Sequence, residues 1–387
     1  MVAAASAVVA VGAVSGLLAA SGGGESNDTA RPAEVSAAPE LQPLPARPSA
    51  SASPSPSASP SPSASPSTSA SPSKSAARKA PKPSKPKPKT APAAPVRHDP
   101  VSAALYRHPE SQALDWVRAN PGDSRRAVIE SRIAAQPSAV WFAEYNPGSI
   151  TGKVRAVTSG AAAAGRVPVL VPYAIPDRDC GGASQGGAPD LGAYDGWIRG
   201  FADGLGSGEV IVVLEPDAVA YADCLSGGER DARYASLARA ARTMKAANPR
   251  ARVYFDAGHS GWHAPAKMAA MLRAAGAHTA GDGIFTNVAN FHTTGDEAAY
   301  ARRVLDALGG PSHLGAVIDT SRNGNGAPGA EEWCDPSGRA IGQSPTTRTG
   351  SDRIDAYLWV KLPGESDGCK GAAGEFSPDW AYELATG

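Results

Sequence analysis

The stretch Val210-Ile-Val-Val-Leu-Glu-Pro-Asp217 indicates the fold more clearly than any other part of the sequence. Its five consecutive apolar residues suit a strand that is buried on both faces, as in a parallel sheet. The proline after the strand fixes φ and turns the chain, so a carboxylate follows the strand directly. On this pattern alone Asp217 has two interpretations, a catalytic carboxylate or the N-cap of a helical turn.

Similar apolar runs recur along the chain and alternate with amphipathic or Ala-rich stretches. The predicted strands are 139–142, 167–173, 210–214, 253–255, 284–288, 314–318 and 356–360. The predicted helices between them include 124–136, 194–204, 230–247, 264–275 and 297–308. Alternating strands and helices predict right-handed βαβ units and therefore an α/β fold.

The polar residues at the strand ends distinguish a closed barrel from an open sheet, which the periodicity does not. They are Tyr173 and Asp179, Glu215 and Asp217, Asp256, Asn287 and Asn290, Asp319 and Arg322, then Lys361, Glu365 and Asp367. In a barrel all of these ends meet at one mouth, whereas an open sheet collects them only near a switch point. We therefore expect a barrel of seven parallel strands with a polar site at its mouth.

Only the C-terminal part of the 387 residues has the composition of a folded domain. The first aromatic residue is Tyr106, and the segment before it cannot readily bury enough apolar area to fold. Ser-Pro and Ala-Ser units repeat over residues 48–73, and Lys-Pro and Ala-Pro units over 79–95. The expected organisation is a leader (1–30), a disordered Pro/Ser/Ala/Lys-rich linker (31–97) and one catalytic domain (98–387).

Charge and hydropathy separate the tail from the domain. Residues 1–97 hold ten Lys and Arg against four Asp and Glu, so the remainder holds 27 against 33. An acidic domain does not favour nucleic acid as a partner. The apolar run 2–20 resembles the core of a signal peptide and predicts secretion, with a membrane anchor as the alternative. The basic tail suits contact with an anionic cell wall or membrane surface, or simply a solvated linker.

Four cysteines, Cys180, Cys224, Cys334 and Cys369, lie in the domain. Their wide spacing does not match a zinc site, and an even number in an exported chain indicates two disulfides. Three pairings are open. We favour 180 with 224 and 334 with 369, because each bond would join the loops after adjacent strands.

Hydrolysis of a glycosidic bond usually requires two carboxyl groups, and the strand ends supply several. Asp179 lies in the motif DRDCGG (177–182), where it is either a partner that raises the pKa of a neighbouring carboxyl or the acceptor of a salt bridge from Arg178. Asp256 follows an apolar strand, and there a catalytic role and a structural role are nearly equally supported. His259, His263 and His292 match no HxH or HExxH pattern, so we expect no metal. We expect no cofactor, because phosphate-binding and dinucleotide motifs are absent from the sequence.

Four tryptophans lie close to strand ends, at positions 141, 262, 333 and 359. Indole rings stack on the apolar faces of pyranose sugars, so exposed aromatic residues in a cleft indicate a polysaccharide substrate. Trp359 lies inside an apolar strand and is expected in the core. Trp262 and Trp333, in Gly-rich or polar loops, are better candidates for sugar binding.

Five motifs, in this order, resemble glycoside hydrolase family 6, the family of cellulases and cellobiohydrolases. They are VPVLVPYAIPDRDCGG (167–182), VLEPD (213–217), YFDAGHSGW (254–262), IDTSRNG (318–324) and LWVKLPGESDG (358–368). The resemblance runs from about residue 100 to 385. It implies a distorted barrel of seven parallel strands, the neighbour pairing of the cysteines, a monomer and hydrolysis with inversion at the anomeric carbon.

The resemblance also assigns roles to the residues of those motifs. It implies that Asp217 is the general acid, that Asp179 raises the pKa of the acid and helps to move protons from water, and that Tyr173 favours distortion of the sugar in subsite −1. Asp367 would be the base or its charge partner, and Ser184 would lie in a loop that closes over the bond. The residues implied to bind substrate are Trp141, Asp256, His259, Trp262, Asn287, Asn290, Trp333, Lys361 and Glu365, with Asp256 mainly structural.

Within the family, exo enzymes have long loops over a tunnel and endo enzymes have short loops beside a cleft. The second cysteine pair spans only 35 residues, so we expect a cleft and an endo-β-1,4-glucanase. An exo-acting cellobiohydrolase is the first alternative. A cell-wall protein that binds glucan without hydrolysing it is the second, and the intact Asp179, Asp217 and Asp367 argue against it.

Overall fold

Seven parallel strands form one sheet in a computed structural model that describes residues 101, 103–329 and 332–387. They are β1 (Val140–Phe142), β2 (Val169–Pro172), β3 (Val210–Leu214), β4 (Ala251–Asp256), β5 (Gly283–Thr286), β6 (Gly315–Asp319) and β7 (Ile354–Leu358). Each strand pairs in parallel with the next one along the chain. The predicted α/β class and the seven strands are confirmed, whereas the expected leader (1–30) and linker (31–97) lie outside the described residues.

The sheet curls into a distorted, incompletely closed barrel. Within the described residues β1 and β7 share no ladder, and the seam between them is bridged by a hydrogen bond of 2.9 Å from the Ala139 amide to the Trp359 carbonyl. The Trp141 indole reaches across the same seam and donates to the Val360 carbonyl at 2.7 Å. Loosely joined edge strands leave room for a cleft at this side of the barrel mouth.

The sheet separates two apolar cores. The inner core fills the barrel with side chains such as Val171, Val213 and Phe285, each fully or almost fully buried. The outer core packs the other face of the strands against helices, where Trp197 and Phe201 are completely buried. Burial on both faces explains why β3 consists entirely of apolar residues.

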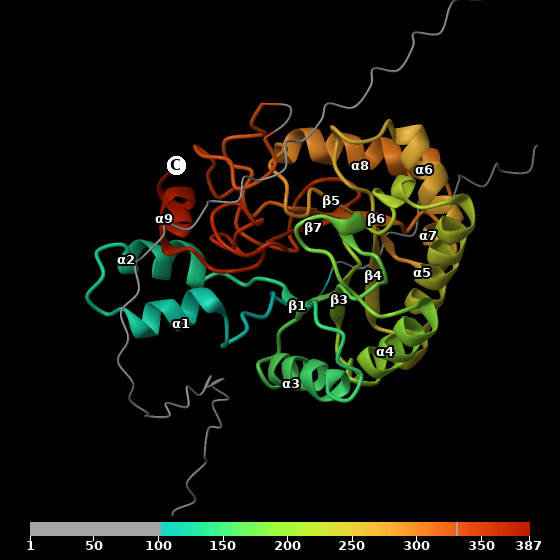
Figure 1. Cartoon of the computed structure of the whole chain (residues 1–387), viewed down its shortest axis with the longest axis horizontal. Coiled ribbons are helices and arrows are strands. Elements are labelled where there is room, and N and C mark those ends of the chain that lie inside the picture. The colour runs from blue at the N-terminus through green and yellow to red at the C-terminus, as the bar shows by residue number, and fades with distance from the viewer. Residues whose placement is uncertain (1–100, 102, 330–331) are drawn as a thin grey trace, which may run out of the picture. The chain divides into compact units, whose positions relative to one another are not determined.

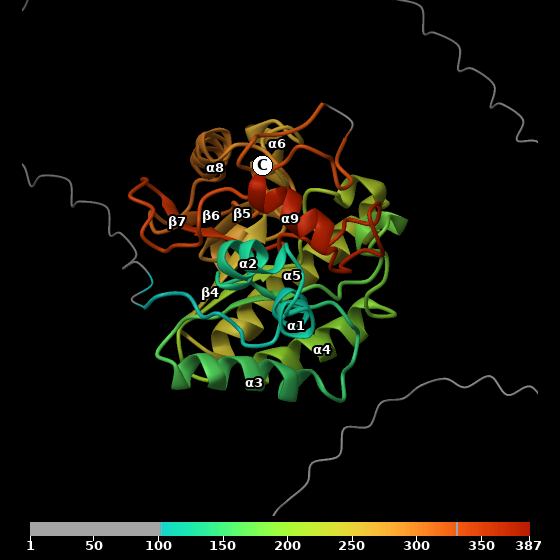
Figure 2. The ribbon, with the colours of Figure 1, turned by 90° about the vertical axis from the view of Figure 1, so that its left-hand side faces the viewer.

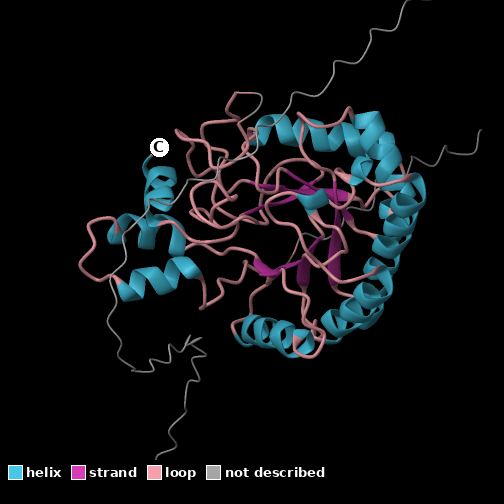
Figure 3. Cartoon of the chain, viewed as in Figure 1, coloured by secondary structure: helices cyan, strands magenta, loops and turns pink. Residues whose placement is uncertain are grey.

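Helices α3 to α8 surround the strands in an arc, as Figures 1 and 3 show. They are α3 (Ile150–Ala163), α4 (Leu191–Asp203), α5 (Gly227–Ala247), α6 (Pro265–Ala274), α7 (Ala277–Ala280) and α8 (Thr294–Leu308). Three helices lie together where the arc is open, α1 (Gln112–Ala119), α2 (Arg126–Ile129) and α9 (Pro378–Thr386), and they face the viewer in Figure 2. No helix in the described part of the chain is long and apolar enough to cross a bilayer.

The predicted helices 194–204, 230–247, 264–275 and 297–308 correspond to α4, α5, α6 and α8. The predicted helix 124–136 is instead two pieces, α2 and a π-helical turn at Glu130–Ala134. Helices α1, α3 and α9 were not predicted. Helix α3 combines two glycines with five β-branched residues, which weakens its sequence signal, but a buried face of Ile150, Val154, Val157 and Ala161 holds it on the sheet.

Candidate active site

A cleft of about 1410 Å³ opens at the C-terminal ends of the strands. Its lining combines strand-end loops with the N-terminal segment before α1. The expected site residues that line it are Trp141, Tyr173, Asp179, Ser184, Asp217, His259, Trp262, Asn290, Trp333, Lys361, Glu365 and Asp367. The convergence that the barrel prediction required is therefore present.

Asp217 faces this cleft from a strained turn after β3. Its φ is +69°, and that of Glu215 is +47°, both in a region that residues with a side chain rarely occupy. Glu215 fixes the turn from below, because its fully buried carboxylate accepts hydrogen bonds from the amides of Ala174 and Ile175 at 3.0 to 3.1 Å. The Asp217 carboxyl makes no hydrogen bond with the described residues, so it does not cap a helical turn.

Burial raises the pKa of Asp217 well above its ordinary value, and the nearby charges of Asp256 and Asp179 raise it further. Asp256 lies beneath it and accepts hydrogen bonds from the amides of Val219, Ala220 and Gly258. Three amide donors favour the charged form of Asp256, whereas Asp217 has none. Burial raises the pKa of Asp256 as well, but these amides oppose the shift, so the pair favours the proton on Asp217 rather than on Asp256.

Asp179 is linked to Tyr173 through Ser184. The Asp179 carboxylate accepts from the Ser184 amide at 2.7 Å and from its hydroxyl at 3.0 Å. The Tyr173 hydroxyl lies 2.9 Å from the same Ser184 oxygen. Burial is the main cause that raises the pKa of Tyr173, so its hydroxyl stays protonated.

Arg178 forms no salt bridge with Asp179, which was the alternative expected from the motif. Its guanidinium donates to the carbonyls of Ala143, Tyr173 and Ser184, and it lies 4.6 Å from the centre of the Tyr173 ring. Arg178 therefore holds together the loops after β1 and β2. The Asp179 carboxylate remains available to the cleft.

Asp256 and Asn287 were expected to bind substrate, but neither lines the cleft. Asp256 is 1% exposed and its oxygens are occupied by the amides described above. Asn287 is fully buried and bonds to the main chain of His292 and Asp319. Their direct contact with a sugar is not supported, because their polar atoms hold the loops that carry cleft residues.

Asp367 also lines the cleft and is held there by two cations. Its carboxylate lies 2.8 Å from the Arg322 guanidinium and 3.6 Å from the Lys361 ammonium. Arg322 is fully buried, and burial lowers the pKa of Lys361. The Asp367 amide donates to Asp335, a buried carboxylate that the sequence did not identify.

Glu365 is another carboxyl group of the cleft lining. Burial raises its pKa to about 7, although the Lys361 charge opposes the shift. The Gln112 amide donates to its carboxyl at 3.0 Å and to the Gly374 carbonyl at 2.7 Å. Gln112, the first residue of α1, thus connects the N-terminal segment to the cleft.

Two pairs of aromatic rings line the cleft together with Asp217. Trp141 meets Tyr173 edge to face with ring centres 5.3 Å apart, and Trp262 meets Tyr221 in the same way at 5.6 Å. His259 stacks on His292 at 4.4 Å, and burial, aided by His292, lowers its pKa to about 4. The described residues contain no group of three or more His, Cys, Asp or Glu that could hold a metal ion. Trp359 is buried, as expected.

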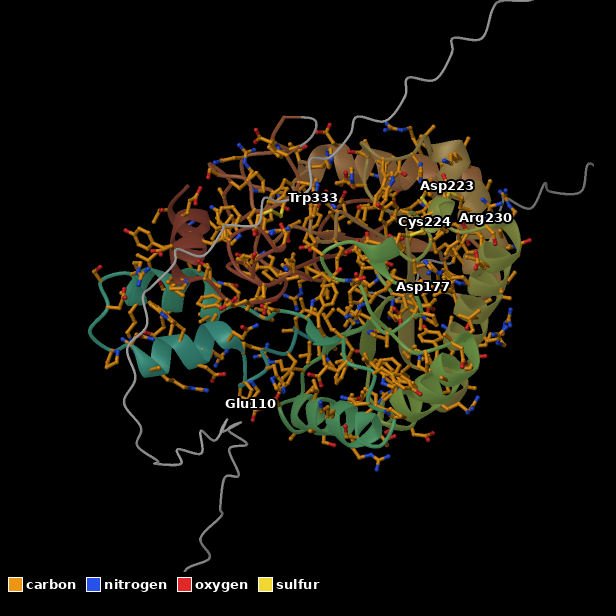
Figure 4. All side chains as sticks on the ribbon, viewed as in Figure 1. Glu110, Asp177, Asp223, Cys224, Arg230 and Trp333 are labelled. Atoms are coloured by element: carbon orange, nitrogen blue, oxygen red, sulfur yellow. A yellow bond between two sulfur atoms is a disulfide. The ribbon has the colours of Figure 1, made fainter. Side chains whose placement is uncertain are left out.

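The disulfides join Cys180 to Cys224 and Cys334 to Cys369, which confirms the expected pairing. The first connects the loop that carries Asp179 with the loop that follows Asp217. The second connects the loop before β7 with the loop that carries Asp367. Figure 4 labels Cys224, which belongs to the first disulfide, and Trp333, which directly precedes Cys334 of the second.

Three contributors to the site were missed in the sequence. Asp335 directly follows Cys334, and Tyr221 lies four residues after Asp217, so proximity in sequence to a predicted site or disulfide residue was the available signal. Gln112 lies more than 250 residues before its partner Glu365, and no local pattern marks it. Such long-range contacts become visible only when the barrel is assembled.

Comparison with known proteins places this site in a family. The model of the glycosyl hydrolases family 6 matches residues 100–382. Endoglucanase 1 of Streptomyces sp. (strain KSM-9) is 57% identical over 287 residues, covering 74% of this chain and 79% of the relative. Endoglucanase A of Thermobispora bispora is 51% identical over 282 residues, covering 73% of this chain but 61% of the relative.

A solved structure shows the same fold. The endoglucanase Cel6 of Mycobacterium tuberculosis, in complex with methyl-cellobiosyl-4-deoxy-4-thio-β-D-cellobioside, aligns with a TM-score of 0.69 and 42% identity. The alignment covers 74% of this chain and 98% of that one. The chain belongs to glycosyl hydrolase family 6.

Proposed function

We propose that this glycosyl hydrolase is a secreted, inverting endo-β-1,4-glucanase that cuts cellulose or soluble β-glucan. The observation that carries the proposal is the Asp217 carboxyl, which faces the cleft with a raised pKa, in a lining that also contains two pairs of aromatic rings. A carboxyl that remains protonated near neutral pH can donate to a glycosidic oxygen. The aromatic rings of the lining offer stacking surfaces for the sugars.

In this mechanism Asp217 protonates the leaving oxygen while water attacks the anomeric carbon from the opposite face. Asp179 stabilises the protonated acid by its charge, and the proton that the attacking water loses passes along the hydroxyls of Tyr173 and Ser184 to the Asp179 carboxylate. Tyr173 presses on the sugar in subsite −1 and favours its distortion. No cofactor enters the reaction.

Asp367 completes the proposal as the base or as the charge partner of the attacking water. Its ion pairs with Arg322 and Lys361 hold the carboxylate at a fixed position in the wall. An inverting glycosidase needs room for water beside the group that takes the proton of that water, and when Asp367 is this base it replaces Asp179 as the proton acceptor.

Replacing Asp217 by Ala tests the acid role. The variant should lose hydrolysis of cellohexaose by several orders of magnitude while still binding it in calorimetry. Unchanged hydrolysis would contradict the assignment. Binding by the unmodified protein without any product after long incubation would instead favour the glucan-binding alternative.

The relatives named endoglucanases support internal cutting, as do disulfides that span only 44 and 35 residues. We expect the viscosity of carboxymethylcellulose to fall quickly while few reducing ends form. Steady release of cellobiose with little loss of viscosity would identify an exo-acting cellobiohydrolase. Proton NMR of fresh cellohexaose products reports the stereochemistry, and an initial β product would contradict inversion.

The apolar run 2–20 and the two disulfides support secretion. Activity should therefore appear in the culture medium or at the cell surface. If the basic tail holds the enzyme on an anionic wall, moderate salt should release it from washed cells, because salt screens such contacts. Full retention in the cytosol would contradict the proposal.

A further inference from the structure

Tyr221 is an exposed aromatic residue that the proposed mechanism does not use. Its side chain is 40% exposed, and it lines the cleft four residues after Asp217. Three large apolar residues of the described chain are this exposed, namely Tyr221, Trp333 and Tyr382. Tyr221 and Trp333 lie in the cleft lining, whereas Tyr382 does not. An aromatic ring left in water within the cleft requires a reason, and sugar stacking supplies one.

The main chain fixes Tyr221 relative to the acid. Its amide donates to the Asp217 carbonyl at 2.9 Å, closing a single turn between the two residues. Its carbonyl lies 3.5 Å from the Sγ atom of Cys180 in the bridge to Cys224. The bridge therefore holds Tyr221 in place together with the loop that carries Asp179.

Trp262 supplies the second ring of this corner and is itself tightly held. Gly258, with a φ of +58°, leaves no room for a Cβ atom, because such an atom would lie 2.9 Å from the Trp262 ring. The ring centres of His259 and His263 lie 5.4 and 5.9 Å from that of Trp262, and both rings are tilted against it. Tyr221 meets Trp262 at an angle of 64°, so the two rings form a corner open to the cleft.

The proposed mechanism places subsite −1 at Tyr173, whose ring meets Trp141. Tyr221 and Trp262 line the same cleft, and the turn from Asp217 to Tyr221 ties this corner to the acid. With subsite −1 at Tyr173, the corner is an aromatic surface available to the sugars on the leaving-group side. The two rings meet at an angle, so one can stack on a pyranose face while the other closes its edge.

We propose that Tyr221 is a specificity-determining residue that binds the leaving-group part of the glucan. It selects substrates whose leaving group is a β-1,4-glucan chain over substrates with a small leaving group. This inference rests on the proposed hydrolysis of β-1,4-glucan. Tyr221 stacks on a sugar that departs after cleavage, so it contributes only when the leaving group is itself a glucan. A role in holding Asp217 or Asp179 would instead affect every substrate.

The test compares Tyr221→Ala, Tyr221→Phe and the unmodified enzyme on two substrates. Cellohexaose occupies the leaving-group side of the cleft, whereas β-cellobiosyl fluoride releases only fluoride and leaves that side empty. With cellohexaose, kcat/KM of Tyr221→Ala should fall about tenfold, the order expected for one aromatic contact. With the fluoride it should stay within about twofold of the unmodified value. Tyr221→Phe keeps the ring and should retain most of the activity on both.

Tyr382→Ala is the matched control, because this tyrosine is 38% exposed but lies on α9 outside the cleft. This variant should have the same kcat/KM as the unmodified enzyme on both substrates. Equal losses on the two substrates, or none for Tyr221→Ala on cellohexaose, would overturn the inference. Failure of the unmodified enzyme on both substrates would refute the proposed function itself, which is a distinguishable result.

Discussion

Asp335 should be the residue on which the loop carrying Asp367 most depends. One of its carboxylate oxygens accepts from the Ser366 hydroxyl at 2.5 Å and from the amides of Cys369 and Lys370 at 3.1 and 2.9 Å. The other accepts from the Asp367 amide at 2.8 Å. All four donors come from residues 366–370, so one anion organises the whole turn.

Asp335→Asn keeps the shape of the side chain but replaces one acceptor with an NH₂ group. In its better orientation the NH₂ group faces the Asp367 amide, which leaves one buried donor without a partner at a cost of about 1–3 kcal/mol. The other three bonds also lose their charge assistance. We expect the free energy of unfolding in urea to fall by about 2–4 kcal/mol. Displacement of Asp367 should lower kcat on cellohexaose by about 10- to 100-fold.

The pH dependence gives an independent measurement. Burial opposes the charged form of Asp335, but hydrogen bonds from Ser366, Lys370 and neighbouring amides outweigh it and lower its pKa. A lowered folded-state pKa adds stability above the unfolded value of about 3.9, and this contribution is lost as the pH falls below it. The unmodified enzyme should therefore lose more stability between pH 5 and 3 than Asp335→Asn does.

Asp306→Asn is the matched control, because that carboxylate is 72% exposed and pairs with Arg353 at the surface. It should change the unfolding free energy by less than about 1 kcal/mol. Unchanged stability and kcat in Asp335→Asn would refute the reasoning. A loss of stability with normal kcat in the folded protein would refute the positioning of Asp367.

Three further predictions follow from other contacts. Asp179→Asn removes a negative charge that raises the pKa of Asp217, so the alkaline limb of the kcat/KM profile should move to lower pH, and an unmoved limb would contradict the coupling. Gly187→Ala would put a Cβ atom 2.0 Å from the Ile175 carbonyl oxygen at a φ of +110°, so thermal unfolding should show a loss of about 3 kcal/mol or more, and a normal melting temperature would disprove the close approach. Ser226→Ala removes one half of the capping box of α5 and should cost about 1 kcal/mol in urea unfolding without changing kcat; a loss of activity would show that the helix end affects the site.

The strands could be predicted from the sequence because local patterning determines them. The run from Val210 to Leu214 is apolar throughout, and the structure contains β3 at these residues. Helix α9 was missed because it is nine residues long and follows a loop without periodicity. It packs beside α2, a contact between segments more than 240 residues apart, and no local pattern could reveal it.

The strand-end carboxylates were the least predictable part of the site. Asp217 and Glu215 belong to one motif, but the first faces the cleft and the second binds the amides of Ala174 and Ile175 below it. A proline between them reverses the direction of the chain, and both have a positive φ. The sequence placed both at a strand end but could not determine which carboxylate faced outward.

The buried carboxyl groups hold the loops of the cleft in fixed positions and also affect the stability of the fold. Glu215, Asp256, Asp319 and Asp335 each accept two or more main-chain amides from loops that carry cleft residues. Burial raises the pKa of Glu215 to about 7 and also raises that of Asp319, so both resist ionisation. A raised folded-state pKa means that stability declines as the pH rises above the unfolded value. The compensation is structural, because the buried Glu215 carboxyl holds the amides of Ala174 and Ile175 beside the strained turn that presents Asp217 to the cleft.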